Sequence, residues 1–252
     1  MNEIHHNIKF QQLDNILEQK IRTHLNKLNK SDNQKNLELC QVGKLLGTYF
    51  PEYNILETRE SPDFIIKNGF EKIGVEHELI IDSTLKKKEG FYENICKKVE
   101  EKLDENKNMP NFLVNCLFKS DLDYKIREKG EIINSITSII SDYVLESKFP
   151  DNKFFHSIMK MNHSRKTINA NFGAHIQNPI TKSHISSAIK KKELKIENYI
   201  NNTVQLQWLV LVIGSSGESS FEVDKLFEYN ITSSFSKIFL YEDFNNRLFE
   251  LK

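Results

Sequence analysis

Cysteine, proline and long apolar runs are scarce in this sequence of 252 residues, and each scarcity narrows the class of protein. The three cysteines, Cys40, Cys96 and Cys116, are widely spaced and form no C-x-x-C pair, which indicates reduced thiols in a cytoplasmic protein. The longest apolar run, 208–214, is far shorter than the roughly 20 residues that span a bilayer, so we expect no membrane partner. The first residues also lack the apolar core of a secretory signal.

An excess of charge of either sign is missing as well. The chain has 35 basic and 35 acidic residues, which argues against a protein coated in positive charge. One segment departs from this balance, because residues 160–199 contain only two acidic residues beside Lys160, Arg165, Lys166, Lys182, Lys190, Lys191, Lys192 and Lys195. Such a segment suits either a phosphate-binding face or a solvated helix face, and the sequence leaves both open.

The spacing of apolar residues predicts alternating helices and strands. Helices are expected over 11–30, 37–49, 86–106, 130–147 and 181–201. Strands are expected over 53–60, 62–68, 72–81, 111–118, 154–163, 167–177, 206–215, 235–243 and 247–252. The apolar stripe from Ile132 to Val144 is either core or the face of a homodimer. No linker or repeat marks a boundary, so the order favours one α/β domain with a mixed sheet flanked by helices.

The expected strand 72–81 contains two glutamates, which a half-buried strand normally avoids. Side chains alternate across a strand, so His77 faces one way and Glu76 and Glu78 face the other, their Cα atoms roughly 6.5–7 Å apart. If Asp63 on the preceding strand faces the same way, three carboxylates converge. Oxygen ligands of this kind suit Mg²⁺, which would offset their repulsion. The alternative is a set of edge-strand residues that face solvent.

The residues Pro62-Asp63 and Glu76-His77-Glu78 resemble the signature of the PD-(D/E)xK nuclease superfamily. The resemblance covers about Glu38 to Leu117, in the order helix, strand, strand, strand, helix, strand. A second stretch, "AIKKKELKIENYI" followed by "WLVLVIG" and "FSKIFLYE", resembles the end of uncharacterised bacterial proteins with this nuclease-like core. The chain therefore resembles a branch of the superfamily with E-x-E in place of E-x-K.

This resemblance implies a restriction-endonuclease-like fold that hydrolyses phosphodiester bonds of nucleic acid, with DNA as the expected substrate. It implies a helical extension over 1–35, a catalytic core over 36–120, and further helices and strands over 121–252 that complete the sheet. Asp63, Glu76 and the backbone carbonyl of His77 would hold Mg²⁺ or Mn²⁺. The His77 ring, on the other face, would be a packed core histidine.

Glu78 departs from the pattern, because the superfamily places a lysine there. Glu78 would act as a general base, position the attacking water or bind a second metal. Alternatively a lysine from elsewhere supplies the positive charge. The candidates for that role and for phosphate binding are Lys97, Lys98, Lys190, Lys191, Lys192 and Lys195.

Three further acidic residues compete for a place in the site. The superfamily often adds a carboxylate from the helix before the sheet, here Glu38, and Glu57 and Glu60 lie just upstream of Asp63. Tyr199 and Trp208 fit core or interface aromatics better than base-stacking platforms. The rival hypothesis is an inactive nuclease-like module that binds nucleic acid or protein.

Overall fold

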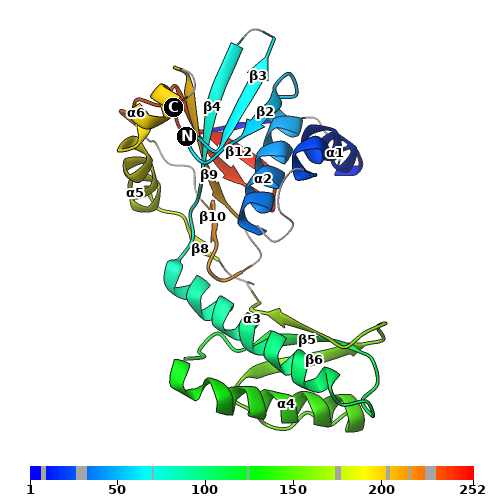
Figure 1. The fold of residues 1–252 in the computed structure, drawn as a ribbon. Helices are drawn as coiled ribbons and strands as arrows, with labels where there is room; N and C mark the ends of the chain where they lie inside the picture. The colour runs from blue at the N-terminus through cyan, green and yellow to red at the C-terminus, as the bar shows by residue number, and fades with distance from the viewer. Residues whose placement is uncertain are drawn as a thin grey trace. The chain divides into compact units, whose positions relative to one another are not determined.

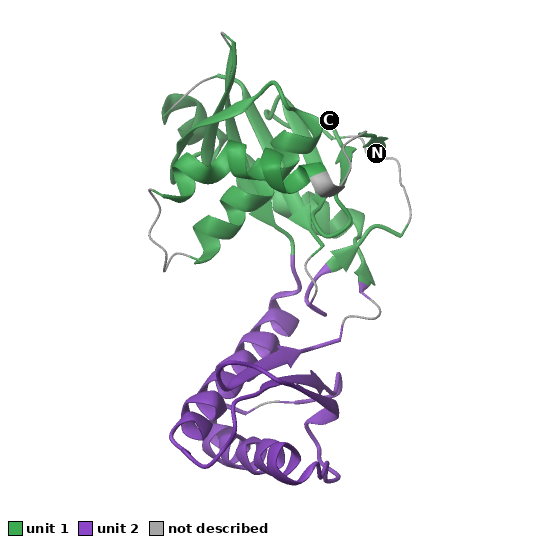
Figure 2. Ribbon diagram, turned by 90° about the vertical axis from the view of Figure 1, so that its right-hand side faces the viewer, with its two compact units in different colours: residues 1–80, 178–215, 221–252 green, residues 81–177, 216–220 purple. Residues whose placement is uncertain are grey.

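The protein has a mixed α/β fold in which helices and strands alternate along the chain (Figure 1). The computed structural model describes residues 1–6, 10–26, 33–69, 71–123, 125–173, 177–202, 205–214, 217–224 and 231–252. None of the helices in these ranges is long and apolar enough to cross a membrane. The chain divides into two compact units, coloured separately in Figure 2. Unit 1 comprises residues 1–80, 178–215 and 221–252, and unit 2 comprises residues 81–177 and 216–220.

Unit 1 is built on a seven-stranded mixed sheet. In spatial order its strands are β1 (Asn2–Ile4), β12 (Arg247–Glu250), β11 (Lys237–Glu242), β9 (Gln207–Ile213), β4 (Glu71–Leu79), β3 (Phe64–Asn68) and β2 (Asn54–Thr58). Strand β9 runs parallel to both of its neighbours, and the other pairs are antiparallel. Every residue of β9 is buried, which explains why this strand carries the longest apolar run.

Helices cover both faces of this sheet. Helix α2 (Asn33–Tyr49) lies on one face with α1 (Phe10–Leu25) packed beside it, and α5 (Lys182–Glu193) and α6 (Ile196–Asn202) lie on the other. Alternate residues of β9 serve the two layers: Val210 and Val212 pack toward α2, and Leu209 and Leu211 pack toward α5 and α6. A two-stranded parallel sheet of β8 (Asn178–Pro179) and β10 (Phe221–Glu222) completes the unit.

Unit 2 is a three-stranded sheet with two helices packed against it. The strand order is β6 (Phe155–Met161), β5 (Leu113–Phe118) and β7 (Thr167–Asn171). Helix α3 (Ser83–Asp104) and helix α4 (Lys129–Glu146), which follows the short 3₁₀ helix η1 (Ile126–Glu128), share one apolar core with this sheet. Asp82 caps α3, accepting hydrogen bonds from the backbone N–H groups of Thr84 and Leu85.

Most of the expected elements are present, but their assembly differs from the sequence-based expectation in three ways. The expected single domain is divided into two compact units, because unit 2 is inserted between β4 and β8 without a glycine- or proline-rich linker. Strand β5, expected inside the 36–120 core, belongs to the separate sheet of unit 2, and β9 pairs with β4 instead. The first segment is not purely helical, since β1 joins the sheet of unit 1.

The boundaries also shift at several elements. The helix expected over 181–201 is two helices separated by a turn, and α1 ends at Leu25, with residues 27–30 of the expected helix outside the described part of the chain. Residues 174–176, expected to extend β7, also lie outside it. The stripe from Ile132 to Val144 is core, because its buried members contact α3 and the sheet of unit 2. Cys40, Cys96 and Cys116 are free thiols, as expected.

Candidate functional site: a buried carboxylate and lysine cluster

The alternation predicted for β4 is confirmed by the packing of unit 1. Ile73, Val75 and Leu79 join the core beneath α2, and the ring of His77 points to the same side. Glu76 and Glu78 point to the opposite side, where α5 and α6 lie. Glu76 is buried, with only 4% of its surface exposed, so its carboxylate has been removed from water.

Asp63 comes just before β3, at the point where the ladder between β3 and β4 ends. The last paired residues are Phe64 and Val75. Alternate N–H groups of β4 point toward β3, so the next one after Val75 that does so belongs to His77, and it lies beyond the end of the ladder. The Oδ2 atom of Asp63 accepts this N–H at 2.9 Å, and Oδ1 accepts from Nζ of Lys35 on α2 at 3.0 Å. Asp63 therefore lies at the end of the strand pair, beside Glu76.

Lys192 brings a positive charge to Glu76 from far along the chain. In α5 the buried residues Ile185, Ala188 and Ile189 recur at helical spacing, and Lys192 continues the same stripe. Its Nζ atom donates to Glu76 Oε1 at 2.6 Å and to the His77 carbonyl oxygen at 3.1 Å, and lies 3.0 Å from Glu78 Oε2. One ammonium group thus contacts three oxygens of β4.

A second donor reaches Glu76 from α6. Tyr199 follows the buried Ile196 at a spacing of three residues, and its hydroxyl donates to Glu76 Oε1 at 3.0 Å. The other carboxylate oxygen, Oε2, is buried and has no hydrogen-bond partner among the described residues. The two oxygens of Glu76 are therefore unequal: Oε1 receives two donors and Oε2 remains an open acceptor.

Glu78 lies at the rim of the cluster. Its Oε1 atom is 2.6 Å from Nζ of Lys191, whose side chain is 61% exposed, and its Oε2 atom shares Lys192 with Glu76. Glu38 is linked to the cluster by Lys35, because the Nζ atom of Lys35 lies 3.3 Å from Glu38 Oε2 and also contacts Asp63. The cluster therefore combines four carboxylates, of Glu38, Asp63, Glu76 and Glu78, with three ammonium groups, of Lys35, Lys191 and Lys192.

Burial and the neighbouring charges shift the pKa values of the buried pair Glu76 and Lys192. Burial, and then the charge of Asp63, raise the pKa of Glu76 above its ordinary value, although Lys192 and Tyr199 oppose the shift. Burial alone would lower the pKa of Lys192, but its contacts with Glu76 and Glu78 outweigh burial and raise that pKa. Burial also raises the pKa of Tyr199, and the charge of Glu76 raises it further, so the hydroxyl stays protonated as a donor. The carboxylate of Glu76 therefore holds a proton more tightly than an exposed glutamate does.

A buried chain of hydrogen bonds supports the site from the α2 side. Gln41 donates through Nε2 to Asp243 Oδ2 at 3.1 Å, so its carbonyl oxygen, 2.8 Å from His77 Nε2, accepts the ring N–H. Burial lowers the pKa of His77, which favours the neutral ring. His77 is a packed core histidine, as expected. The hydrogen bonds through Gln41 hold His77 in place, and the backbone N–H and carbonyl of His77 both face the cluster.

The donor set fits a divalent cation in its chemistry. Carboxylates of Asp63 and Glu76 and the carbonyl of His77 are hard oxygen ligands, and the open Oε2 of Glu76 is a buried acceptor without a donor. However, no group of three or more His, Cys, Asp or Glu side chains in the described ranges is arranged to hold an ion as it stands. In the structure, lysines contact these same carboxylates.

Several predicted residues lie outside this cluster. Glu57 pairs with Arg59 at 2.7 Å and Glu60 is exposed, so neither joins Glu76. Lys97 and Lys98 are on α3 and belong to unit 2. Lys190 and Lys195 are exposed on α5 and in the turn after it. The basic segment 160–199 is divided, since Lys160, Arg165 and Lys166 are in unit 2.

Three members of the site were not identified from the sequence. Tyr199 was interpreted as a core or interface aromatic, and it is indeed buried, but its hydroxyl binds Glu76. Lys35 and Gln41 were not considered. Lys35 offered a signal, because it precedes Leu39, Val42 and Leu46 at helical spacing and so falls on the buried stripe of α2.

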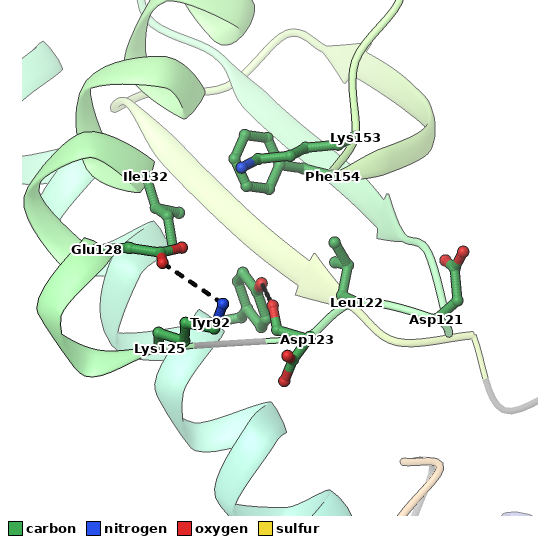
Figure 3. Close-up of a pocket in the computed structure, with 9 residues that line it drawn as sticks. All are labelled: Tyr92, Asp121, Leu122, Asp123, Lys125, Glu128, Ile132, Lys153 and Phe154. Atoms are coloured by element: carbon green, nitrogen blue, oxygen red, sulfur yellow. Dashed lines mark hydrogen bonds and ion pairs between the residues drawn. The ribbon is translucent and has the colours of Figure 1, made fainter.

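A separate hollow of about 310 Å³ lies in unit 2 (Figure 3), and none of the residues that line it belongs to the cluster on β4. Its charged lining groups partly neutralise one another, since Lys125 lies 3.8 Å from Glu128, and Lys153 lies over the ring of Phe154. The hydroxyl of Tyr92 donates to the backbone carbonyl of Asp123. The described residues that line this hollow include no buried pair of a carboxylate and an ammonium group, so the cluster on β4 is the stronger candidate for chemistry.

Comparison with family models, with curated proteins and with solved structures finds no match for this chain.

Proposed function

We propose that this protein is a metal-dependent nuclease that hydrolyses phosphodiester bonds of nucleic acid, with DNA as the expected substrate. The observation that carries the proposal is the position of Lys192. The E-x-E sequence on β4 lacks the lysine that the nuclease signature requires, and Lys192 of α5 brings an ammonium to the same carboxylates, 2.6 Å from Glu76 and 3.0 Å from Glu78.

The order of elements in unit 1 supports a restriction-endonuclease-like fold. Helix α2, strands β2, β3 and β4, helices α5 and α6 and strand β9 follow the order helix, strand, strand, strand, helix, strand. Strand β9 lies parallel to β4 and next to it. In this proposal the core is 33–80 together with 182–213, and unit 2 is an insertion between its third strand and its second helix.

The residues would divide the work as follows. Asp63, Glu76 and the His77 carbonyl would hold Mg²⁺ or Mn²⁺, which when bound would polarise the phosphodiester and lower the pKa of a water molecule. Lys192 would stabilise the negative charge that develops on the phosphate. Tyr199 would hold Oε1 of Glu76, leaving Oε2 for the ion. Glu78 would keep Lys192 and Lys191 in place, and the exposed Lys190, Lys191 and Lys195 would contact neighbouring phosphates.

One observation favours a second function. Because Lys192 already occupies the space among three oxygens of β4, the cluster satisfies most of its own charges without an ion. An inactive nuclease-like module that binds nucleic acid or protein would look the same. The test must therefore measure chemistry as well as binding.

The experiment is cleavage of plasmid, single-stranded DNA and RNA by the purified chain with Mg²⁺, with Mn²⁺ or with chelator. Cleavage that requires the metal and disappears in Glu76→Gln would support the nuclease. A matched control is Glu250→Gln, because Glu250 is also a strand glutamate paired with a lysine, Lys237 at 2.7 Å, and it should cut like the wild type. Nucleic-acid binding without any metal-dependent cleavage would favour the inactive module.

A further inference from the structure

The ammonium group of Lys192 stands where a cation is needed. Its Nζ atom contacts Glu76 Oε1 at 2.6 Å, Glu78 Oε2 at 3.0 Å and the His77 carbonyl oxygen at 3.1 Å. Two of these groups, Glu76 and the His77 carbonyl, are the ones that the proposed metal site would use. The side chain of Lys192 is only 10% exposed, so water screens its charge weakly.

Two positive charges cannot share this position without a large repulsion. An ion bound by Glu76 and the His77 carbonyl would lie within a few ångströms of Nζ, where unit charges interact strongly even at the effective dielectric constant of about 20 used for proteins. Lysine carries its charge at the end of a flexible four-carbon chain, so the ammonium is able to move while α5 stays in place. Tyr199 would still donate to Oε1 at 3.0 Å, so Glu76 would keep its orientation.

We propose that Lys192 is a built-in competitor of the divalent cation, which keeps the site closed until a phosphate draws its ammonium away. This inference rests on the proposed function, since it assumes that the ion binds at Glu76. It adds a regulatory property: metal and nucleic acid bind cooperatively, because each removes Lys192 from the carboxylates. Thermodynamic linkage requires the effect to be reciprocal, so the metal also tightens nucleic-acid binding by the same factor.

The test measures metal affinity in the absence of nucleic acid. Mn²⁺ is titrated into wild-type protein and Lys192→Met by calorimetry at mildly alkaline pH, where protons compete least for Glu76. Removing one buried charge next to the ion should tighten Mn²⁺ binding about tenfold or more, whereas cleavage by the same variant should fall. A lysine that only stabilises the fold would give weaker or unchanged Mn²⁺ binding.

Two lysines serve as matched controls for metal affinity. Lys191→Met removes a neighbouring ammonium from Glu78, but that side chain is 61% exposed, so the expected gain is smaller than about threefold. Lys237→Met breaks a strand ion pair on β11, outside the cluster, and should leave Mn²⁺ affinity unchanged. Equal gains in all three variants would overturn the proposal, because they would reflect net charge alone.

A second measurement uses the wild-type chain, in case Lys192→Met fails to fold. Lysines are labelled with an amine-reactive reagent and quantified by mass spectrometry, with and without Mn²⁺. The proposal expects labelling of Lys192 to rise several-fold with Mn²⁺ while Lys237 stays constant; protection of Lys192 by Mn²⁺ would overturn it. Failure of the proposed function would give a different result. In that case neither the wild-type protein nor Lys192→Met would bind Mn²⁺, and neither would cut nucleic acid.

Discussion

Each of the two units buries a glutamate, and the surroundings of the two side chains differ. Glu89 in unit 2 is 2% exposed, and both of its oxygens are satisfied: Ser219 donates through its backbone N–H to Oε1 and through its hydroxyl to Oε2. Glu76 in unit 1 is 4% exposed, yet two donors crowd on Oε1 and Oε2 has none among the described residues. Buried polar atoms are normally hydrogen-bonded, so the unbonded Oε2 makes Glu76, and not Glu89, the carboxylate with capacity for a ligand.

The difference between Glu76 and Glu89 is tested most strongly by neutralising each glutamate in turn. Glu76→Gln removes a charge from the proposed ion site, so the rate of cleavage should fall by more than about a hundredfold. This loss exceeds the roughly 10–100-fold loss that is typical when a residue that only supports a metal ligand is mutated. Glu89→Gln should cut normally but lose about 1–3 kcal/mol of unfolding free energy, because its hydrogen bonds to Ser219 are weakened. Plasmid cleavage and chemical denaturation check the pair. If Glu89→Gln abolished cleavage as well, the distinction between the two glutamates would be wrong.

Moving the lysine tests whether its charge matters more than its origin. Lys192→Met should impair cleavage, and the double variant Lys192→Met with Glu78→Lys returns an ammonium to the E-x-K position on β4. We expect the double variant to cut about tenfold faster than Lys192→Met alone, which is part of the roughly 10²–10³-fold contribution of one well-positioned donor. The rates are measured on one DNA substrate at saturating Mg²⁺. A double variant no faster than Lys192→Met would show that the ammonium must come from α5.

Removing a single hydroxyl should have a moderate effect. Tyr199→Phe deletes the donor to Oε1 while keeping the ring in the core, so Mn²⁺ affinity should fall a few-fold as Glu76 loses its orientation. The unfolding free energy should fall by about 0.5–1.5 kcal/mol, the usual net contribution of one hydrogen bond. Tyr143→Phe in unit 2 is the control for the substitution itself. An unchanged Mn²⁺ affinity in Tyr199→Phe would leave Tyr199 a packing residue.

The smallest expected effect is a dependence of stability on pH. The folded-state pKa of Glu76 is raised above its ordinary value of 4.5, so the folded protein holds this proton more tightly than the unfolded chain. Stability from this group is therefore present at low pH and is lost as pH rises from 4.5 through the raised pKa, by at most about 1.4 kcal/mol per pH unit. Glu76→Gln lacks this loss, so its melting temperature relative to wild type should rise with pH in metal-free buffer. A parallel pair of pH curves would contradict the assignment.

Local patterns predicted the parts of the site that lie on one strand. The period of two in "IGVEHEL" was enough to separate Glu76 and Glu78 from His77, because one face of β4 is apolar. The position of Lys192 beside Glu76 was harder to predict, since six lysines were candidates. Its register with Ile185, Ala188 and Ile189 was a usable signal, because it places this lysine on the buried side of α5.

The assembly of strands was not predictable in the same way. Strands β5 and β9 are both short buried runs in the sequence, and the family resemblance, which covered about Glu38 to Leu117, placed β5 in the nuclease-like core. The pairing of β4 with β9 joins segments on either side of unit 2, and such nonlocal pairing leaves no local mark. Tyr199 was missed for a related reason, since only the packing of α6 on the sheet brings its hydroxyl to Glu76.

The most direct test of the account is to locate the ion. Crystals of the protein soaked in Mn²⁺ would be measured near the manganese absorption edge, and an anomalous difference map would be calculated. We expect a peak within about 2.0–2.6 Å of Oε2 of Glu76 and of the His77 carbonyl oxygen, with Lys192 moved away from both. A map with Lys192 still bound to Glu76 and no peak beside that carboxylate, at millimolar Mn²⁺, would contradict it.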